Sequence, residues 1–254
     1  MTSHISNSVE ARRNGNRLIA QLREDDWRLL APHLEVAEFQ REEVLFRQGE
    51  DVSRCCFPCE GMVASLRVAD SSGNVCEVCS IGQEGAAGGI ISHGQAPAYT
   101  SAVTAAPGPA LTITATKLDA IKGKSPNIER LFARYADCLL AQIMQASVCN
   151  ALHDVEQRIA RWLLGFDDRL GGSRILVTQE ALAAALGVGR PYASRQLKSL
   201  EAKGLIRLRR GAIEIRDRSA VERHSCDCYQ SVRDHFATVI SGLYPPPPSE
   251  ALRP

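Results

Sequence analysis

The sequence predicts an α+β protein with an N-terminal antiparallel β-roll of the jelly-roll type, a long helix, and a C-terminal helix pair followed by a small hairpin. Three patterns predict this order. Short apolar runs separated by glycine turns fill residues 36–116, which is typical of short antiparallel strands. An apolar stripe at helical spacing begins at Pro126 and continues for about seven turns. Two short helical patterns flank Gly187, and alternating apolar residues follow them up to Ile215.

The N-terminal part divides into a polar segment, 1–17, that we expect to be flexible, and a roll domain, 18–125. The roll domain opens with a helical pattern over 16–34, which places Leu18, Leu22, Leu29 and Leu30 on one side. Glycine turns separate the apolar runs Val44–Phe46, Met62–Val68, Val75–Ile81 and Leu111–Thr114. Residues 117–121 are expected to form a short helical turn.

The long helix is expected over residues 126–153. Its apolar stripe consists of Ile128, Leu131, Phe132, Tyr135, Leu139, Gln142, Ile143, Ala146 and Cys149. A helix of this length leaves a second face exposed after one face packs on the roll, so we expect a coiled-coil-like contact with a second copy. The alternative is a helix buried entirely within one chain.

The C-terminal domain is expected over residues 154–241, before a proline-rich tail at 242–254. A helix over 154–170 with Val155, Ile159, Trp162 and Leu163 inward leads into it. Ser219 to Glu222 matches a capping box and should begin a final helix that passes through Val221, Cys228, Val232, Phe236 and Ile240.

The segment from Val177 to Ile215 has the pattern of a helix-turn-helix with a basic wing. Thr178 can cap the first helix, and Gly187 can end it at positive φ. In the second helix Ala193, Leu197 and Leu200 share the inner face, whereas the outer face carries Arg190, Tyr192, Ser194, Arg195 and Lys198. Arginine can donate two hydrogen bonds to a guanine, and serine and tyrosine can form hydrogen bonds with bases or phosphates. The pattern therefore predicts a recognition helix for a DNA major groove.

The charge distribution supports this interpretation over an ordinary solvated helix. Residues 174–216 contain nine Lys/Arg and three Asp/Glu, a net charge of +6, whereas residues 1–150 have a net charge of −3. The whole chain is near neutral, at +1. Basic charge is thus concentrated where a nucleic acid would bind.

Length and composition restrict the classes of protein to which this chain can belong. A chain of 254 residues can form two domains with their own cores. No apolar run is long enough to span a membrane, and the polar N-terminus has no secretory signal, so we expect a cytoplasmic protein without a membrane partner. The nine cysteines should then be thiols rather than disulfides.

The element order over residues 18–216 resembles the Crp/Fnr family of bacterial transcription regulators. The resemblance rests on three segments of the roll, Glu43–Glu50, Phe57–Val63 before the next strand and Ile81–Gly85 after that strand. It rests most specifically on Gly187–Arg190 continuing through Ser194 and Arg195. It implies a cyclic-nucleotide-binding-like roll, a dimer, and binding to a palindromic double-stranded operator. RNA polymerase and a small-molecule effector of unknown identity are further candidate partners. We expect no enzymatic activity and no cofactor.

The resemblance also assigns roles to residues of the helix-turn-helix. Arg190, Pro191 and either Ser194 or Arg195 match base-contacting positions, and Thr178 and Tyr192 match positions that hold phosphate. Lys198 on the same helix and Arg209 in the wing are further candidates for phosphate contacts. Many members have Glu where this chain has Pro191. A glutamate carboxylate accepts a hydrogen bond from cytosine N4 and proline cannot, so a different half-site is expected.

The effector side departs from the family pattern. Cyclic-nucleotide-binding members carry Gly-Glu followed by Arg-Ser or Arg-Thr, whose guanidinium binds the cyclic phosphate. Here the corresponding positions are Gly82, Gln83, Glu84, Gly85, Thr100 and Ser101, and residues 82–103 contain no Arg or Lys. A phosphate diester would lose its charge-assisted bonds, at about 1.5–3 kcal/mol each, so we expect no dependence on cyclic nucleotides.

Two alternatives to this function remain open from the sequence. Cys56/Cys59 and Cys76/Cys79 form two CxxC pairs with zinc-like spacing, which would suit a redox or metal sensor that regulates DNA binding. However, residues i and i+3 of a strand point to opposite faces. His224 with Cys228 on the last helix offers two ligands, too few for a closed site. The other alternative is a small-molecule-binding roll protein or enzyme without a DNA function.

Overall fold

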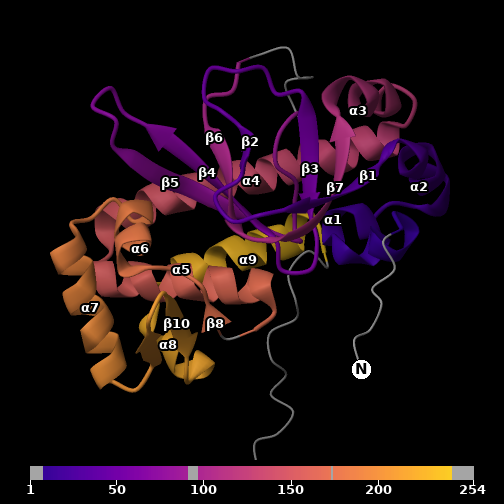
Figure 1. Ribbon diagram of the computed structural model, residues 1–254. Helices are drawn as coiled ribbons and strands as arrows, with labels where there is room; N and C mark the ends of the chain where they lie inside the picture. The colour runs from indigo at the N-terminus through magenta and orange to yellow at the C-terminus, as the bar shows by residue number, and fades with distance from the viewer. Residues whose placement is uncertain (1–7, 91–96, 173, 242–254) are drawn as a thin grey trace, which may run out of the picture.

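The computed structural model describes residues 8–90, 97–172 and 174–241. A β-roll lies above a helix-turn-helix unit, and one long helix runs along the roll (Figure 1). No helix of these residues combines the length and apolarity needed to cross a bilayer. The proline-rich tail at 242–254 lies outside the described residues.

Two antiparallel sheets form the roll, as the sequence predicted. One sheet has the strand order β2-β6-β4-β5 and the other β1-β7-β3. The strands are β1 (Glu35–Phe39), β2 (Val44–Phe46), β3 (Arg54–Pro58), β4 (Val63–Ala69), β5 (Val75–Ile81), β6 (Ser101–Ala106) and β7 (Gly108–Thr114). Strand β4 pairs with both β5 and β6, so the chain returns to an earlier strand after a long connection, as in other jelly rolls.

The N-terminal residues are more ordered than expected. Residues 8–17 belong to the stretch expected to be flexible, but they include a 3-10 helix, η1 (Glu10–Gly15), whose Arg12 side chain is buried and pairs with Glu60 at 2.8 Å. The buried Asn16 amide donates to the carbonyls of Pro58 and Gly85. These long-range bonds fix the segment to the roll. Residues 1–7 lie outside the described part of the chain.

The single helix expected over 16–34 is wrong. The chain forms α1 (Arg17–Ala20), α2 (Glu24–Leu30) and η2 (Ala31–His33) instead. It turns between α1 and α2, so their apolar residues follow two separate helix axes. Leu18, Leu22 and Leu30 are buried, but Leu29 is 41% exposed.

Helix α4 (Pro126–Leu152) confirms the predicted long helix, and Ser125 caps its first turn. The preceding turn is helix α3 (Ala115–Lys122). Ile128, Phe132 and Tyr135 of α4 pack into the core beneath β3 and β7, whereas Leu139 and Ile143 lie against the sheet that contains β4 and β5. The long helix therefore contacts both sheets of the roll.

The C-terminal unit begins with α5 (Val155–Leu170) and has its own core. It continues through β8 (Arg174–Ile175), α6 (Gln179–Ala185), α7 (Arg190–Ala202), β9 (Ile206–Arg209) and β10 (Ala212–Ile215). The predicted hairpin β9–β10 is present, and β8 adds a third strand beside β10. Gly187 joins α6 to α7 at φ +63°, a conformation that glycine adopts without a Cβ clash.

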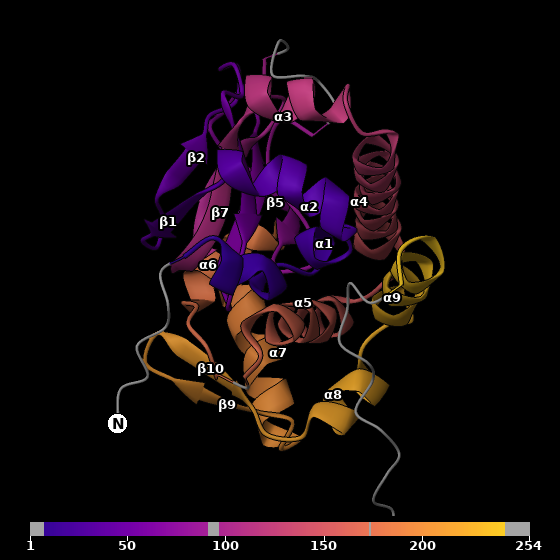
Figure 2. The ribbon, with the colours of Figure 1, turned by 90° about the vertical axis from the view of Figure 1, so that its right-hand side faces the viewer.

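The expected final helix is divided in two. Helices α8 (Arg218–His224) and α9 (Cys228–Val239) are separated at Ser225–Asp227. Asp217 caps α8 by accepting from the Ala220 amide, so Ser219 is not the cap. Because the chain turns there, α9 lies beside the end of α4 (Figure 2), and its Phe236 enters the core of the roll.

The buried face of α7 gives a stability prediction. Leu197 is fully buried in the core of the C-terminal unit, so Leu197→Ala should cost about 2–5 kcal/mol through lost burial and a cavity. The exposed neighbour serves as control: Lys198→Ala should change stability by about 0.5 kcal/mol or less. Urea unfolding can be followed in a Trp27→Phe background, where Trp162 of the same core is the remaining indole. Equal effects of the two substitutions would contradict the packing.

Candidate DNA-binding surface

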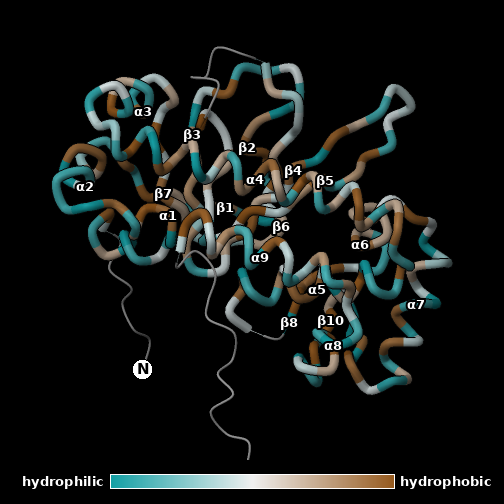
Figure 3. Tube along the Cα trace, turned by 180° about the vertical axis from the view of Figure 1, so that it is seen from behind, coloured by the Kyte–Doolittle hydropathy of each residue, from teal (hydrophilic) through white to brown (hydrophobic). Residues whose placement is uncertain are grey.

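Helix α7 has one buried and one exposed side. Ala193, Leu197 and Leu200 have no exposed surface, and the two leucines pack in the core formed with α5 and α6. Gly189 caps the helix, and Pro191 lies in its first turn, where no intrahelical donor is lost. Figure 3 shows the alternation of hydrophilic and hydrophobic residues along this helix. The rotation of α7 is therefore fixed by its apolar side.

The other side of α7 presents the residues expected to read bases. Arg190, Pro191, Tyr192, Arg195 and Lys198 are exposed, and Ser194 is half-buried. The Arg195 guanidinium lies 5.6 Å from the centroid of the Tyr192 ring, a cation–π distance. The structure therefore brings the predicted donors of this helix together on one surface.

Thr178 and Arg209 lie on neighbouring elements and already have partners within the chain. The Thr178 hydroxyl accepts from the Ala181 amide and caps α6, as predicted. Across the wing, the Arg209 Nε lies 3.3 Å from both carboxylate oxygens of Glu214. The Arg209 side chain is still 43% exposed. Such a surface pair is worth at most about 1 kcal/mol, so a phosphate can compete for the guanidinium.

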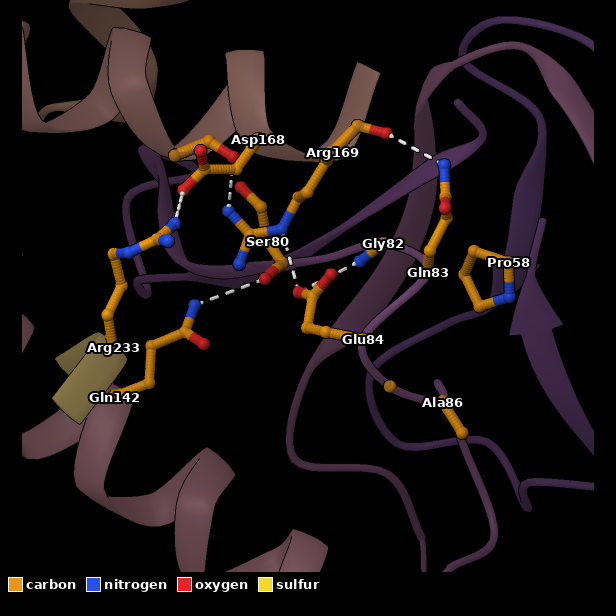
Figure 4. Close-up of polar contacts among 12 residues, drawn as sticks. Pro58, Ser80, Gly82, Gln83, Glu84, Ala86, Gln142, Asp168, Arg169 and Arg233 are labelled. Carbon is orange, nitrogen blue, oxygen red and sulfur yellow. Dashed lines mark hydrogen bonds and ion pairs between the residues drawn. The ribbon is translucent and has the colours of Figure 1, made fainter. Parts of the chain in front are cut away.

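The turn at Gly82–Gly85, an expected effector site, is occupied by the chain's own side chains. Glu84 is buried and accepts from Arg169 Nε of α5 at 2.8 Å and from the Gly82 amide at 3.1 Å (Figure 4). The Gln83 amide donates to the Arg169 carbonyl. Gly85 approaches the Tyr135 ring so closely that a Cβ would lie 2.1 Å from its hydroxyl. The Glu84 carboxylate thus faces α5 and joins the roll to the C-terminal unit.

The other expected effector residues lie on a different part of the roll. Ser101 begins β6, and its hydroxyl accepts from the Gln48 amide. Thr100 precedes it and is half-buried. In the described part of the chain, these hydrogen bonds of the two stretches therefore go to different elements, and the expected ligand set stays a prediction.

The two CxxC pairs belong to different sheets. Cys56 lies in β3 and Cys59 just after it, whereas Cys76 and Cys79 lie in β5. Burial raises the pKa of the Cys56 thiol to about 12 and that of Cys59 to about 11. The Cys76 Sγ instead lies 3.6 Å from the Ala185 carbonyl at the end of α6. Within the described ranges these four thiols form no group of three or more ligand atoms.

Sequence reasoning missed three side chains that the structure makes prominent. Arg169 was not recognised as the partner of Glu84, because the two residues are 85 positions apart. Cys149 and His153 lie beside Cys226 and Cys228, also across a long separation. His224, which the sequence placed with Cys228, instead has its Nε2 3.2 Å from a carboxylate oxygen of Glu156. No local spacing could have indicated these contacts.

A cavity of about 330 Å³ lies between the roll and the C-terminal unit. Roll residues on one side, including Arg67 and Glu77, face Trp162, Phe166 and residues of α6 on the other. Trp162 and Phe166 stack at a centroid distance of 3.9 Å, and the Trp162 indole donates to Glu77 at 2.9 Å. Glu77 thus gives the two units a second polar link.

The buried Glu84–Arg169 pair gives a second prediction. Both side chains are about 95% buried, so Arg169→Met or Glu84→Gln alone should cost about 3–5 kcal/mol by leaving one polar group without its partner. The double variant should cost clearly less than the sum of the two. The exposed pair Arg28–Glu24 is the control, and Arg28→Met should cost about 1 kcal/mol or less. Denaturant unfolding measures all four, and strict additivity would contradict the direct pairing.

The comparisons with known proteins agree with this geometry. A family model described as the Crp-like helix-turn-helix domain matches residues 157–224. No curated protein matches the sequence. Among solved structures, the c-di-GMP-responsive global regulator CLP of Xanthomonas campestris is 17% identical with a TM-score of 0.63, covering 77% of this chain and 100% of its own.

Two further solved structures have a similar fold. FixK2 of Bradyrhizobium japonicum has a TM-score of 0.64 at 14% identity, covering 76% of this chain and 98% of its own. A Crp/Fnr-family regulator described as putative, from Eubacterium rectale, has a TM-score of 0.59 at 18% identity, covering 83% of this chain and 98% of its own. Residues 157–224 therefore form a Crp-like helix-turn-helix domain, and they do so within a chain that has the fold of the Crp/Fnr-family transcription regulators.

Proposed function

We propose that the protein is a homodimeric transcription regulator that binds a palindromic operator in double-stranded DNA in the cytoplasm and has no enzymatic activity of its own. The observation that carries the proposal is the exposed polar side of α7, whose apolar side is fully buried in a Crp-like helix-turn-helix. A rigid helix with arginines on its free side can lie in the major groove. The net charge of +6 over residues 174–216 would attract the phosphate backbone.

The roles of the side chains follow from their chemistry and position. Arg190 and Arg195 would each donate two hydrogen bonds to a guanine, with Ser194 between them. Pro191 has no side-chain donor or acceptor and would contribute shape alone. Four other groups, Thr178, Tyr192, Lys198 and Arg209, would hold phosphates and set the register of the protein on DNA.

Regulation by a cyclic nucleotide is not part of the proposal. Residues 82–103 contain no Arg or Lys that could pair with the phosphate, and Glu84 is bound to Arg169. An effector of another class remains compatible with the roll, as does contact between the bound protein and RNA polymerase.

The dimer proposal rests on an unpartnered stripe of α4. Four apolar residues lie on consecutive turns and are 44–76% exposed: Leu140, Met144, Val148 and Leu152. The roll and α9 already occupy other sides of the helix. Apolar residues at this spacing suit a helix–helix contact between two copies, which would place two α7 helices on one operator.

Two substitutions in α7 test whether its side chains contact bases and phosphates as proposed. Arg195→Ala should weaken operator binding by about 1–3 kcal/mol and relax the base preference at one position of each half-site. Lys198→Ala should weaken binding to all DNA sequences alike, because it removes a phosphate contact. It should also reduce the slope of log K against log salt concentration. Selection from randomised DNA, followed by titrations at several salt concentrations, provides both readouts. An unchanged selected sequence for Arg195→Ala would remove this residue from base reading.

The stripe of α4 gives a separate prediction. Met144→Glu should convert the dimer into a monomer, because a carboxylate would be buried against a second apolar helix. The matched control is Asn127→Glu, which adds the same charge at an exposed position about 100° away around the helix. Analytical ultracentrifugation measures the mass directly. A wild-type monomer, or a Met144→Glu dimer as stable as that of the control, would contradict the interface.

A further inference from the structure

Three cysteines and one histidine from distant parts of the chain meet where α4 ends. Cys149 lies in the last turn of α4 and His153 caps that helix, whereas Cys226 lies in the junction between α8 and α9 and Cys228 is the first residue of α9. The three sulfur atoms and one imidazole nitrogen all lie within 4.8 Å of one another. The three cysteines are buried and form a separate cluster in the core.

We propose that Cys149, His153, Cys226 and Cys228 together bind one Zn²⁺ ion. Three thiolates and one imidazole are a common donor set of structural zinc sites. With Zn–S bonds of about 2.3 Å, the sulfurs of a tetrahedral site lie about 3.8 Å apart. The Sγ atoms of Cys149 and Cys226 are 3.5 Å apart, and the Cys228 Sγ is 3.4 Å from His153 Nδ1. The four donors are therefore spaced for one metal ion, with small adjustments.

The surroundings supply the contacts that a zinc site needs beyond its ligands. His153 directs Nδ1 at the cluster, while its Nε2 lies 3.8 Å from the Asp227 carboxylate. This distance is longer than a hydrogen bond, so the carboxylate acts on the imidazole through its charge alone. The Gln145 amide donates to the Cys228 sulfur at 3.1 Å, a bond that suits a thiolate. Arg161 lines the same small cavity as Cys228, and its guanidinium would offset the net charge of −1 that one Zn²⁺ and three thiolates leave on the site.

A disulfide explains the cluster less completely. Linking Cys149 to Cys226 would use two of the four groups and leave Cys228 and His153 in close contact without a role. Within the described part of the chain, the cluster is also the one group of three or more potential ligand atoms that brings Cys and His together. The geometry thus favours one shared ion over a pair of sulfurs.

The ion would have a defined mechanical role. Helix α4 ends at Leu152 and α5 begins at Val155, so the hinge between the long helix and the helix-turn-helix unit lies beside the site. Ligands from α4 and from the α8–α9 junction would join the two sides of that hinge. Bound zinc would therefore hold α7 in a fixed orientation relative to α4, and removal of the ion by a chelator would remove this constraint.

The first test uses the full-length protein, purified under reducing conditions from cells supplied with zinc. Elemental analysis should find about one zinc per chain, and replacement by Co²⁺ should give intense visible d–d bands and a near-ultraviolet sulfur-to-metal charge-transfer band. These bands report tetrahedral thiolate coordination directly and require no variant. Zinc well below one-tenth per chain together with absent Co²⁺ bands, or a Cys149–Cys226 disulfide in the reduced protein, would overturn the proposal.

Variants then identify the ligands. Cys226→Ser should lower metal affinity at least tenfold. His153→Ala should keep the charge-transfer band but shift the d–d bands, because water replaces nitrogen; His153 is 24% exposed, so this change is tolerable to the fold. Cys138→Ser is the matched control, since Cys138 is a fully buried thiol of α4 in another part of the core. Equal metal content and spectra in all three variants would also overturn the assignment.

Discussion

The burial of one side of α7 is the constraint on which the rest of the structure depends. Ala193, Leu197 and Leu200 have no exposed surface, and the two leucines belong to a core built from α5, α6 and the wing. Because a helix has a fixed period, burying these three residues determines that Arg190, Arg195 and Lys198 face outward. Apolar packing thus positions the chemistry of the exposed side, and the bonds of Ser199 and Lys203 to Glu156 of α5 hold the C-terminal end of the helix.

The second constraint is polar and connects the two units. Arg169 of α5 reaches the turn after β5 and pairs with Glu84 (Figure 4). Its neighbour Asp168 accepts from Arg218, Arg233 and the Tyr229 hydroxyl, which ties α8 and α9 to the same helix. Groups of this kind are costly to bury unless they are paired, so their pairing favours one arrangement of α5 over others. Apolar packing and buried ion pairs together therefore fix the position of α5 between the roll and the recognition helix.

Local patterns in the sequence predicted a large part of this architecture. Four features depend on neighbours a few positions away, so the sequence displays them directly: the period of α4, the cap at Thr178, the glycine at 187 and the hairpin around Arg209–Gly211. The single helix over 16–34 was wrong because the chain turns between α1 and α2, where Leu22 enters the core of the roll. The cap at Ser219 was wrong because Asp217, two residues earlier, accepts from the Ala220 amide. Contacts across long separations, including Glu84 with Arg169 and Cys149 with Cys226, have no local signal.

The most direct test of the account places a photocrosslinker on the proposed reading surface. A full-length chain with benzoylphenylalanine at position 195, bound to its selected operator, should crosslink to bases at two places about one helical turn (~10 bp) apart. The same group at position 130, exposed on α4, should not reach the DNA. Bound protein that crosslinks from position 130 and not from 195 would contradict the account, because α7 would then lie outside the groove.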